Sequence, residues 1–363
     1  MYVTRPLSMY IRDPSAISLP PPEGPNSGIL VIKDEEAERT RCFGLCTDNR
    51  VKEFPFPQNK NLKVEYVQQA GQIQHVHINR VVFIPVLNQP LSSNLYYCIE
   101  RNGKHKGEAY KNSTEEDMTT CCFCSRIKDL KPQPLDPQDT YQQLEIIRRK
   151  WGSFAAKSLA PDGFPPLFLR RKGWRVVTTK REFELTEALG LDKTLRNRLP
   201  EFTFPLSEQS SKPVTVGKWY CPFMFIKDGS PKDQVDKSRF YEMRLEQKWE
   251  RVFACENNGK TGNSVNVDVV IETETVGGGE GNNVGLSLEI VERMKWEEVR
   301  FGWTDLDEKK VRVIKVEEFG GLGEWKKFGL YVLVERFVLK RMDGSLVLAY
   351  DFRHIQHIRT KWE

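Results

Sequence analysis

Two stretches of the chain contain short apolar segments, rich in β-branched and aromatic residues, separated by polar turn residues. Segments of this kind are typical of β-strands, whose side chains point alternately to opposite faces of a sheet. The first stretch predicts strands at residues 29–33, 62–67, 80–87 and 94–101. The second predicts strands at residues 218–226, 240–257, 265–275, 284–290, 310–316, 330–340 and 345–352. The pair Asp343-Gly344 before the last strand predicts a hairpin, because these residues suit the backbone of a tight turn.

Two other parts of the chain lack this pattern. The first 28 residues hold six prolines, which exclude regular structure over much of the segment, so we expect an extended arm packed on the body. Prolines break residues 132–137, and residues 139–150 and 186–199 have the pattern of short helices. We therefore predict a mostly β fold with two tandem β-sandwich-like domains. Its expected parts are a proline-rich arm at 1–28, an N-terminal β domain at 29–131, a basic, partly helical connector at 132–215 and a C-terminal β domain at 216–363.

Composition places the chain among folded proteins. Of its 363 residues, 39% are hydrophobic and 29% are charged, and its 20 Phe, 11 Tyr and 8 Trp distinguish it from disordered chains. No run approaches the roughly 18 apolar residues of a membrane-spanning helix, and the first ten residues lack the pattern of a secretory signal. We therefore expect a cytoplasmic or nuclear protein without a transmembrane segment, in which the eight cysteines are reduced.

Positive charge is concentrated in one segment. Residues 148–181 contain ten basic residues and one acid, a net charge of +9 within a chain whose total is +5. Aromatic residues such as Trp151 and Trp174 are interleaved with these charges, and cations beside stacking faces suit nucleic acids or phosphorylated head groups. The alternative is an ordinary connection whose arginines pair with the acidic remainder of the chain. The residues that we expect to bind a polyanion are Arg148, Arg149, Lys150, Arg170, Arg171, Lys172 and Arg175.

Cysteines gather in two places, the run CCFC at 121–124 and a pair with a three-residue gap at 42 and 46. A two-residue gap, as at 121 and 124, lets two thiolates reach one tetrahedral ion, and a three-residue gap is also allowed. These spacings allow a structural zinc ion, and otherwise no cofactor is expected. The interpretation that the sequence favours is buried free thiols, and a redox-sensing exposed thiol is a third hypothesis. The expected zinc ligands are Cys42, Cys46, Cys121 and Cys124.

The histidines suggest a mixed zinc site and weaken the case for catalysis by a cysteine. A mixed zinc site would use His75 or His77, because residues two apart lie on the same face of a strand. Catalysis by a cysteine needs a histidine base beside the thiolate, and none of the five histidines has a sequence context that marks it as one. His354 follows Asp351 by three positions, which puts them on opposite faces of a strand. We therefore assign no catalytic residue.

Several longer motifs resemble a known family. They are MYVTRPLS at 1–8, LPPPEGPNSG at 19–28, FIPVLNQPLSS at 83–93, EEDM at 115–118 with CCFC at 121–124, GKWY at 217–220, ERMKWEE at 292–298 and KRMDGSLVL at 340–348. These motifs are similar to those of the plant family catalogued as domain of unknown function 1262. The resemblance extends over nearly the whole chain and implies a higher-plant intracellular protein. It supplies no activity, ligand or catalytic residue.

The sequence favours a non-enzymatic protein that binds a protein partner or another ligand. An association with stress or defence is suggested by the family context alone. One alternative is polyanion binding, to nucleic acid or to an anionic lipid such as a phosphoinositide, through residues 148–181. Such binding weakens steeply as salt rises. The alternative from another class is an enzyme with a site in a cleft between the two domains, which needs a pocket with titratable groups.

Overall fold

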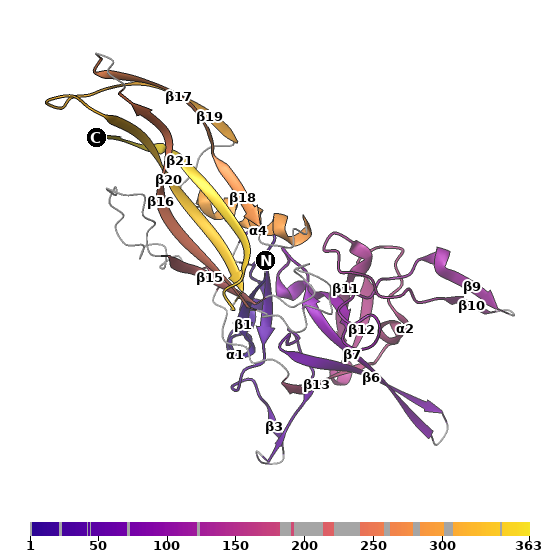
Figure 1. The fold of residues 1–363 in the computed structure, drawn as a ribbon. Helices are drawn as coiled ribbons and strands as arrows, with labels where there is room; N and C mark the ends of the chain where they lie inside the picture. The colour runs from indigo at the N-terminus through magenta and orange to yellow at the C-terminus, as the bar shows by residue number, and fades with distance from the viewer. Residues whose placement is uncertain are drawn as a thin grey trace. The chain divides into compact units, whose positions relative to one another are not determined.

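The structure is a computed structural model (Figure 1). It describes residues 2–21, 24–41, 43, 45–70, 73–121, 124–181, 190–191, 213–220, 240–257, 262–278, 284–300, 308–341 and 343–363. The described chain is dominated by antiparallel strands, which confirms the prediction of a mostly β fold. No helix among these residues is long and apolar enough to cross a membrane.

The chain divides into two compact units. Unit 1 comprises residues 1–190 and 219–240, and unit 2 comprises residues 191–218 and 241–363. Within the segment expected to connect two domains, the strands at Gln143–Arg149, Ser153–Ser158 and Arg175–Arg181 belong to the main sheet of unit 1, beside strands of the expected N-terminal domain. The arrangement into two sandwich-like domains remains a prediction.

Unit 1 is built mainly from strands. Its elements are β1 (Tyr2–Pro6), α1 (Leu7–Arg12), η1 (Pro14–Ser18), β2 (Gly28–Ile32), β3 (Thr40–Arg41), β4 (Cys46–Thr47), β5 (Arg50–Val51), β6 (Lys60–Ala70), β7 (Ile73–Pro85), η2 (Leu91–Ser93), β8 (Leu95–Glu100), η3 (Glu115–Asp117), β9 (Met118–Cys121), β10 (Cys124–Ile127), η4 (Thr140–Gln142), β11 (Gln143–Arg149), η5 (Lys150–Gly152), β12 (Ser153–Ser158), α2 (Leu167–Arg170) and β13 (Arg175–Arg181). Seven of the strands form one sheet in the order β12-β11-β8-β7-β6-β13-β5.

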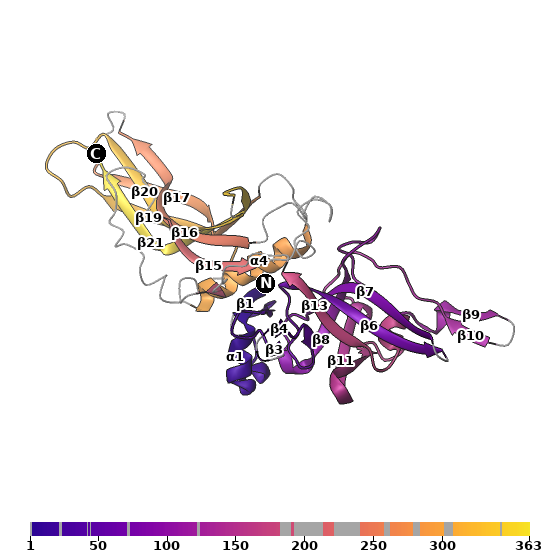
Figure 2. The same ribbon diagram turned by 90° about the horizontal axis from the view of Figure 1, so that it is seen from below.

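A single bridge curls this sheet around its core. Phe154 at the start of β12 pairs with Trp174 just before β13, and the Phe154 N–H donates to the Trp174 carbonyl at 2.8 Å. Strands near the two ends of the sheet are thereby joined. The enclosed core is rich in aromatic residues, with the Phe154 and Trp174 rings 5.4 Å apart and the Phe83 ring stacked on Trp174. Figure 2 shows the β9–β10 hairpin standing away from this sheet.

The N-terminal segment packs on the body, as expected, because Tyr2, Val3 and Tyr10 are buried. β1 pairs with β2 in parallel. The expectation of an arm without helix is wrong for α1, which occupies the proline-free residues between Pro6 and Pro14. A helix can form there because Pro6 precedes its first turn and removes none of its internal hydrogen bonds.

The helix predicted over residues 139–150 is also wrong. The chain forms only the short turn η4 there and continues as β11, which pairs with β8 and β12. Leu144 and Ile146 are buried two positions apart, a strand period. The helix predicted over residues 186–199 lies outside the described residues except for Gly190–Leu191, which form β14.

Three strands of unit 2 have 15 to 17 residues. Besides β14, the rest of the chain forms β15 (Val214–Tyr220), β16 (Phe240–Glu256), β17 (Ser264–Glu272), β18 (Glu274–Gly278), α4 (Val284–Arg300), β19 (Lys310–Glu318), β20 (Lys327–Arg341) and β21 (Leu346–Trp362). The main sheet has the order β14-β15-β16-β20-β21-β18, and β17 pairs separately with β19. The predicted hairpin is confirmed, because β20 and β21 pair on either side of Asp343-Gly344 and Gly344 has a left-handed φ of 88°.

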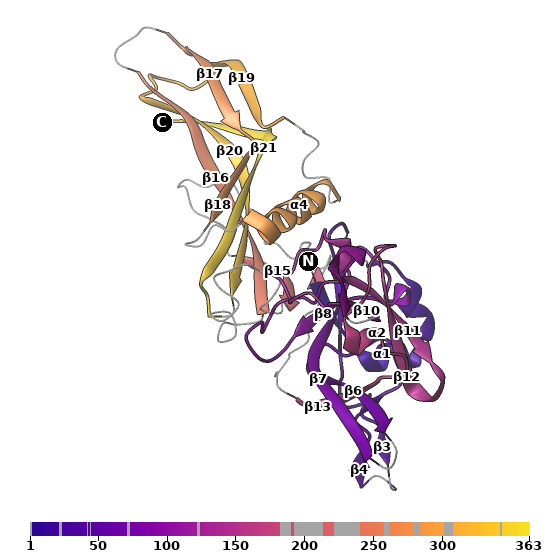
Figure 3. The same cartoon turned by 90° about the vertical axis from the view of Figure 1, so that its right-hand side faces the viewer.

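One strand prediction in unit 2 is wrong. Residues 284–290 begin α4, which continues to Arg300. Ile290 and Met294 are buried four positions apart, the spacing of one helical face. Figure 3 shows α4 lying across the long strands of this unit.

Candidate anion-binding pocket

The curling of the sheet in unit 1 brings together segments that are distant in sequence. β5 pairs with β13, and Val51 lies opposite Val176. The turn η5 connects β11 with β12, whose first residues are held beside β13 by the bridge between Phe154 and Trp174. As a result, residues of η5 lie next to β5 and β13.

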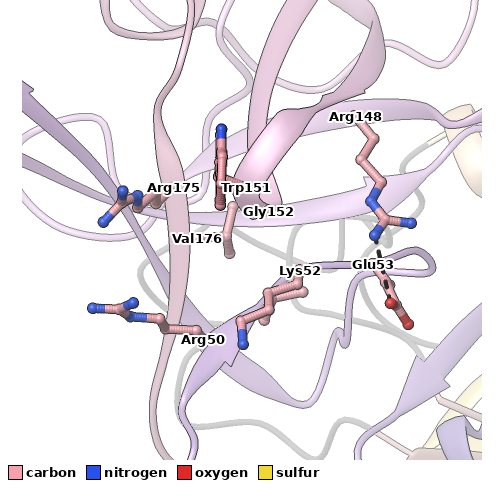
Figure 4. Close-up of a pocket in the computed structure, with 9 residues that line it drawn as sticks. Arg50, Lys52, Glu53, Arg148, Trp151, Gly152, Arg175 and Val176 are labelled. Carbon is pink, nitrogen blue, oxygen red and sulfur yellow. Dashed lines mark ion pairs between the residues drawn. The ribbon is translucent and has the colours of Figure 1, made fainter.

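These elements line an open pocket with a volume of about 480 Å³, within the usual range of small-ligand sites (Figure 4). Four cations and one carboxylate give the lining a net charge of +3. Figure 4 shows that their side chains come from separate segments of the chain. A pocket with several cations on separate elements can contact more than one oxygen of a phosphate-bearing ligand. The charged lining residues are Arg50, Lys52, Glu53, Arg148 and Arg175.

Trp151 is the aromatic residue of the pocket, and it is 91% exposed. Its backbone has φ 64° and ψ 26°, the left-handed conformation, which costs a residue with a side chain about 1–2 kcal/mol. Gly152 follows with φ 65°, and a Cβ there would lie 2.8 Å from Lys52 Cγ. The turn therefore approaches Lys52 closely and presents an indole ring to solvent. Such strain is often associated with functional sites.

Ion pairs constrain one side of the pocket. The Glu53 carboxylate lies 3.5 Å from Arg148 and 3.2 Å from Arg39, so it bridges two guanidinium groups. Lys52 Nζ lies 3.4 Å from an Asp48 oxygen. In the part of the chain that the structure describes, Arg50 forms no ion pair, and the same is true of Arg175.

Only two of the seven basic residues predicted from the sequence line the pocket. Arg148 and Arg175 line the pocket, while Arg149 and Lys150 are exposed beside it at the end of β11 and the start of η5. Arg170 pairs with Asp129 at 3.0 Å, as the alternative reading of the basic segment expects.

Two members of the predicted set lie elsewhere, and two pocket cations were missed. The guanidinium of Arg171 lies over the Tyr66 ring at 5.0 Å, and Lys172 is exposed in the turn before Trp174.

Arg50 and Lys52 were missed because they lie far upstream of the basic segment. Only their close spacing around Val51 distinguishes them in the sequence.

The three predicted zinc ligands that the structure describes lie in two hairpins. Cys121 and Cys124 are register partners at the end of the β9–β10 hairpin, and Cys46 is exposed on β4, opposite Arg41. The two hairpins occupy separate places in unit 1, so the structure does not gather these strands around one ion (Figure 1). Cys42 lies outside the described residues. The zinc site remains a prediction that metal analysis can test.

The interpretation as buried thiols applies to a different cysteine. Cys98, on β8, is fully buried in the core of unit 1. Burial raises the pKa of its thiol well above the ordinary value, and the nearby Glu100 carboxylate raises it further. This thiol is therefore a core residue with little reactivity.

The two histidines proposed for a mixed zinc site are both exposed. His75 and His77 lie on the part of β7 that pairs with β6, opposite Gln68 and Tyr66. Their position on one face of a strand is confirmed by this register. Their use as metal ligands remains a prediction.

Comparison with known proteins supports the family resemblance over part of the chain. Residues 23–123 match the family described as a protein of unknown function, DUF1262. No curated protein matches the chain. Among solved structures, the crystal structure of Cry35Ab1 is similar, with 10% sequence identity over 85% of this chain and 90% of that chain and a TM-score of 0.49. A likeness at this level carries no inference about function.

Proposed function

We propose that the protein is a non-enzymatic binding protein whose basic pocket binds single-stranded nucleic acid. The observation that carries the proposal is Trp151, an exposed indole held in a strained conformation on the rim of a pocket with a net charge of +3. In this proposal Arg50, Lys52 and Arg175 contact the phosphates. A base stacks on Trp151, an interaction available to every base because each has a π face.

Two features favour nucleic acid over an anionic lipid. A phosphoinositide head group has no aromatic ring to stack on Trp151, whereas a nucleotide has both an aromatic base and a phosphate. The pocket volume of about 480 Å³ also suits a group of nucleotide size. Arg149 and Lys150 are exposed next to the pocket and extend the positive surface along which a backbone can continue.

The test is fluorescence anisotropy with a labelled single-stranded oligonucleotide of about a dozen nucleotides, a length within the range that such sites cover. We expect binding by the wild type and a loss of at least tenfold in affinity for the Arg50→Glu/Arg175→Glu variant. Lys104→Glu is the matched control, because Lys104 is exposed in the same unit and does not line the pocket. The control should bind like the wild type.

A second assay, with lipid vesicles, distinguishes binding to nucleic acid from binding to an anionic lipid. The same proteins are sedimented with vesicles of phosphatidylcholine alone and with vesicles that also contain a phosphoinositide. The proposal predicts tight binding to the oligonucleotide and only weak, salt-sensitive binding to the charged vesicles. Binding to the vesicles without binding to the oligonucleotide would contradict it.

A protein partner is a second candidate ligand. The β6–β7 hairpin carries Val67, Val76 and Ile78, which are 41%, 52% and 51% exposed, on one face. Contiguous exposed apolar residues are typical of surfaces that bind other proteins. If this face binds a partner, the Val67→Ser/Val76→Ser variant should lose a protein that co-purifies with the wild type while its stability is unchanged.

The remaining parts of the functional hypothesis rest on the sequence. A place in the cytoplasm or nucleus and an association with stress or defence are expectations from composition and from the family resemblance. The hypothesis of an enzyme with a site between two domains also remains a prediction. The proposed function gives no residue of the basic pocket a catalytic role.

A further inference from the structure

The buried face of α4 in unit 2 is unusually charged. Among the side chains of α4 that the structure describes, at 289–300, five are buried at the three- and four-residue spacing of a packed helix: Ile290, Arg293, Met294, Glu297 and Glu298. Three of these five carry a charge. Arg and Glu side chains are almost never fully buried unless other charges compensate them. The sheet beneath the helix is therefore the place to look for the compensating groups.

That sheet contributes two more ionisable side chains, Glu335 on β20 and His354 on β21, which are 2% and 3% exposed. His354 Nε2 lies 3.2 Å from Glu335 Oε2 and 3.9 Å from Glu298 Oε2. One nitrogen and two carboxylate oxygens thus lie within 4.8 Å of one another. Ligand atoms around a zinc ion lie about 3–3.6 Å apart, so small movements would let all three reach one ion.

A hydrogen bond already orients one of the carboxylates. Gln247 on β16 is the register partner of Glu335, and its Nε2 donates to Glu335 Oε1 at 2.7 Å. The other oxygen of Glu335 is the one that lies near His354. Side chains that hold a metal ligand through its second polar atom are a regular part of metal sites.

The charges beneath α4 also favour a divalent cation. The buried carboxylate, guanidinium and imidazole side chains of unit 2 that the structure describes are those of Arg293, Glu297, Glu298, Glu335, Asp351 and His354. Asp351 pairs with Arg336 through two hydrogen bonds, and Arg293 Nε lies 3.6 Å from Glu297 Oε1. Glu298 and Glu335 place two carboxylates beside one imidazole. A divalent cation among these three groups offsets the repulsion between the carboxylates, and burial of like charges is otherwise costly.

The strand that carries His354 is irregular at this point. The register between β20 and β21 shifts between the pairs Leu333–His354 and Val332–Ile358, so the three residues between His354 and Ile358 form a bulge. Beside the bulge lies a pocket of about 350 Å³ whose lining includes Gln247, Leu333 and His357. Gln247 thus contacts both the pocket and Glu335. Bulges of this kind are over-represented next to functional sites.

We propose that Glu298, Glu335 and His354 form a binding site for one divalent transition-metal ion, with Zn²⁺ the ion expected. A nitrogen donor with two carboxylates suits zinc, whereas Mg²⁺ and Ca²⁺ prefer ligand sets made of oxygen alone. The site shares no residue with the basic pocket or with the predicted cysteine site. The bound ion joins α4 to β20 and β21, so it stabilises unit 2.

The first test is equilibrium dialysis of the full chain against Zn²⁺, with metal analysis and a melting curve for each variant. We expect one ion per chain in this site and a rise in melting temperature with Zn²⁺, both lost in Glu298→Gln and in His354→Gln. Gln247→Ala should weaken binding about tenfold, as is usual for a residue that orients a ligand. Glu292→Gln is the control, because Glu292 is exposed on the same helix. It should bind zinc like the wild type.

The cysteines are a second possible location for zinc, and Co²⁺ substitution of the wild type distinguishes the two. Cobalt bound by thiolates has an intense charge-transfer absorption, whereas cobalt bound by imidazole and carboxylate has only weak visible bands. One bound cobalt ion per chain, with weak visible bands and no thiolate absorption, supports the proposal even if the variants fail to fold. Thiolate absorption alone, zinc binding unchanged in Glu298→Gln and His354→Gln, or no bound zinc would overturn it.

Discussion

Replacement of Trp151 by asparagine should separate the stability of unit 1 from its ligand binding. Trp151 is 91% exposed, so less than a tenth of a side chain of roughly 250 Å² is buried. At about 25 cal/mol per Å², removal of the indole costs roughly 0.5 kcal/mol of apolar burial. Asparagine adopts the left-handed conformation much more readily than tryptophan, which recovers about 1 kcal/mol of strain. The variant should therefore be as stable as the wild type or more stable by about 0.5 kcal/mol.

The same Trp151→Asn substitution should weaken binding of the oligonucleotide. A base stacked on an aromatic ring contributes about 1–3 kcal/mol, so loss of the indole should weaken oligonucleotide binding about tenfold or more. Trp174 provides the contrast, because it is fully buried and its Nε1 donates to the Leu169 carbonyl at 2.9 Å. Trp174→Ala should lose about 3–5 kcal/mol of stability.

Urea unfolding and fluorescence anisotropy measure the two effects on the same preparations. The reasoning is refuted if Trp151→Asn is destabilised by more than about 2 kcal/mol, because the indole would then be packed as a core residue. It is also refuted if the variant binds the oligonucleotide with unchanged affinity.

Three further predictions follow from single contacts. Gly152→Ala should destabilise unit 1 by about 1–2 kcal/mol in urea unfolding, because its Cβ meets Lys52 at 2.8 Å in a left-handed turn. The Ser345 hydroxyl donates a hydrogen bond to the Asp343 carboxylate and lowers the pKa of Asp343. The Asp343 carboxylate therefore stabilises the hairpin at pH values above its pKa in the unfolded chain. This stabilisation is lost as the pH falls through the pKa of Asp343 in the folded protein. The difference in melting temperature between wild type and Asp343→Asn should therefore shrink below about pH 4. Thiol titration should find Cys98 unreactive until the protein is denatured.

The sequence predicts the parts of the fold that depend on local pattern. Short segments rich in β-branched and aromatic residues located β2, β6, β7, β8, β16, β17, β19, β20 and β21, and Asp343-Gly344 located the β20–β21 hairpin. The strands β1, β11, β12 and β13, in the segments expected to be an arm and a connector, were missed. The errors at 139–150 and 284–290 have a common cause, because short apolar segments fit a strand and a helix equally well. Neighbours decide between them: β8 and β12 pair with the first segment, while the second begins a helix that packs on a sheet.

The candidate sites depend on contacts that no local pattern records. The concentration of positive charge in residues 148–181 points to Arg148 and Arg175, but Arg50 and Lys52 join them only because β5 pairs with β13. The cluster around His354 was missed for the same reason. Its one local signal is Glu335, an acid within the apolar run of β20.

The salt dependence of oligonucleotide binding shows whether the basic pocket binds phosphates. Three phosphate contacts, by Arg50, Lys52 and Arg175, predict that log K falls linearly with log salt with a slope of about −2, since each contact with a single strand contributes about −0.7. Arg50→Glu/Arg175→Glu removes two of these contacts, so its slope should be about −0.7. Binding that does not change with salt, or a variant with the affinity and slope of the wild type, would contradict a phosphate-binding role for the pocket.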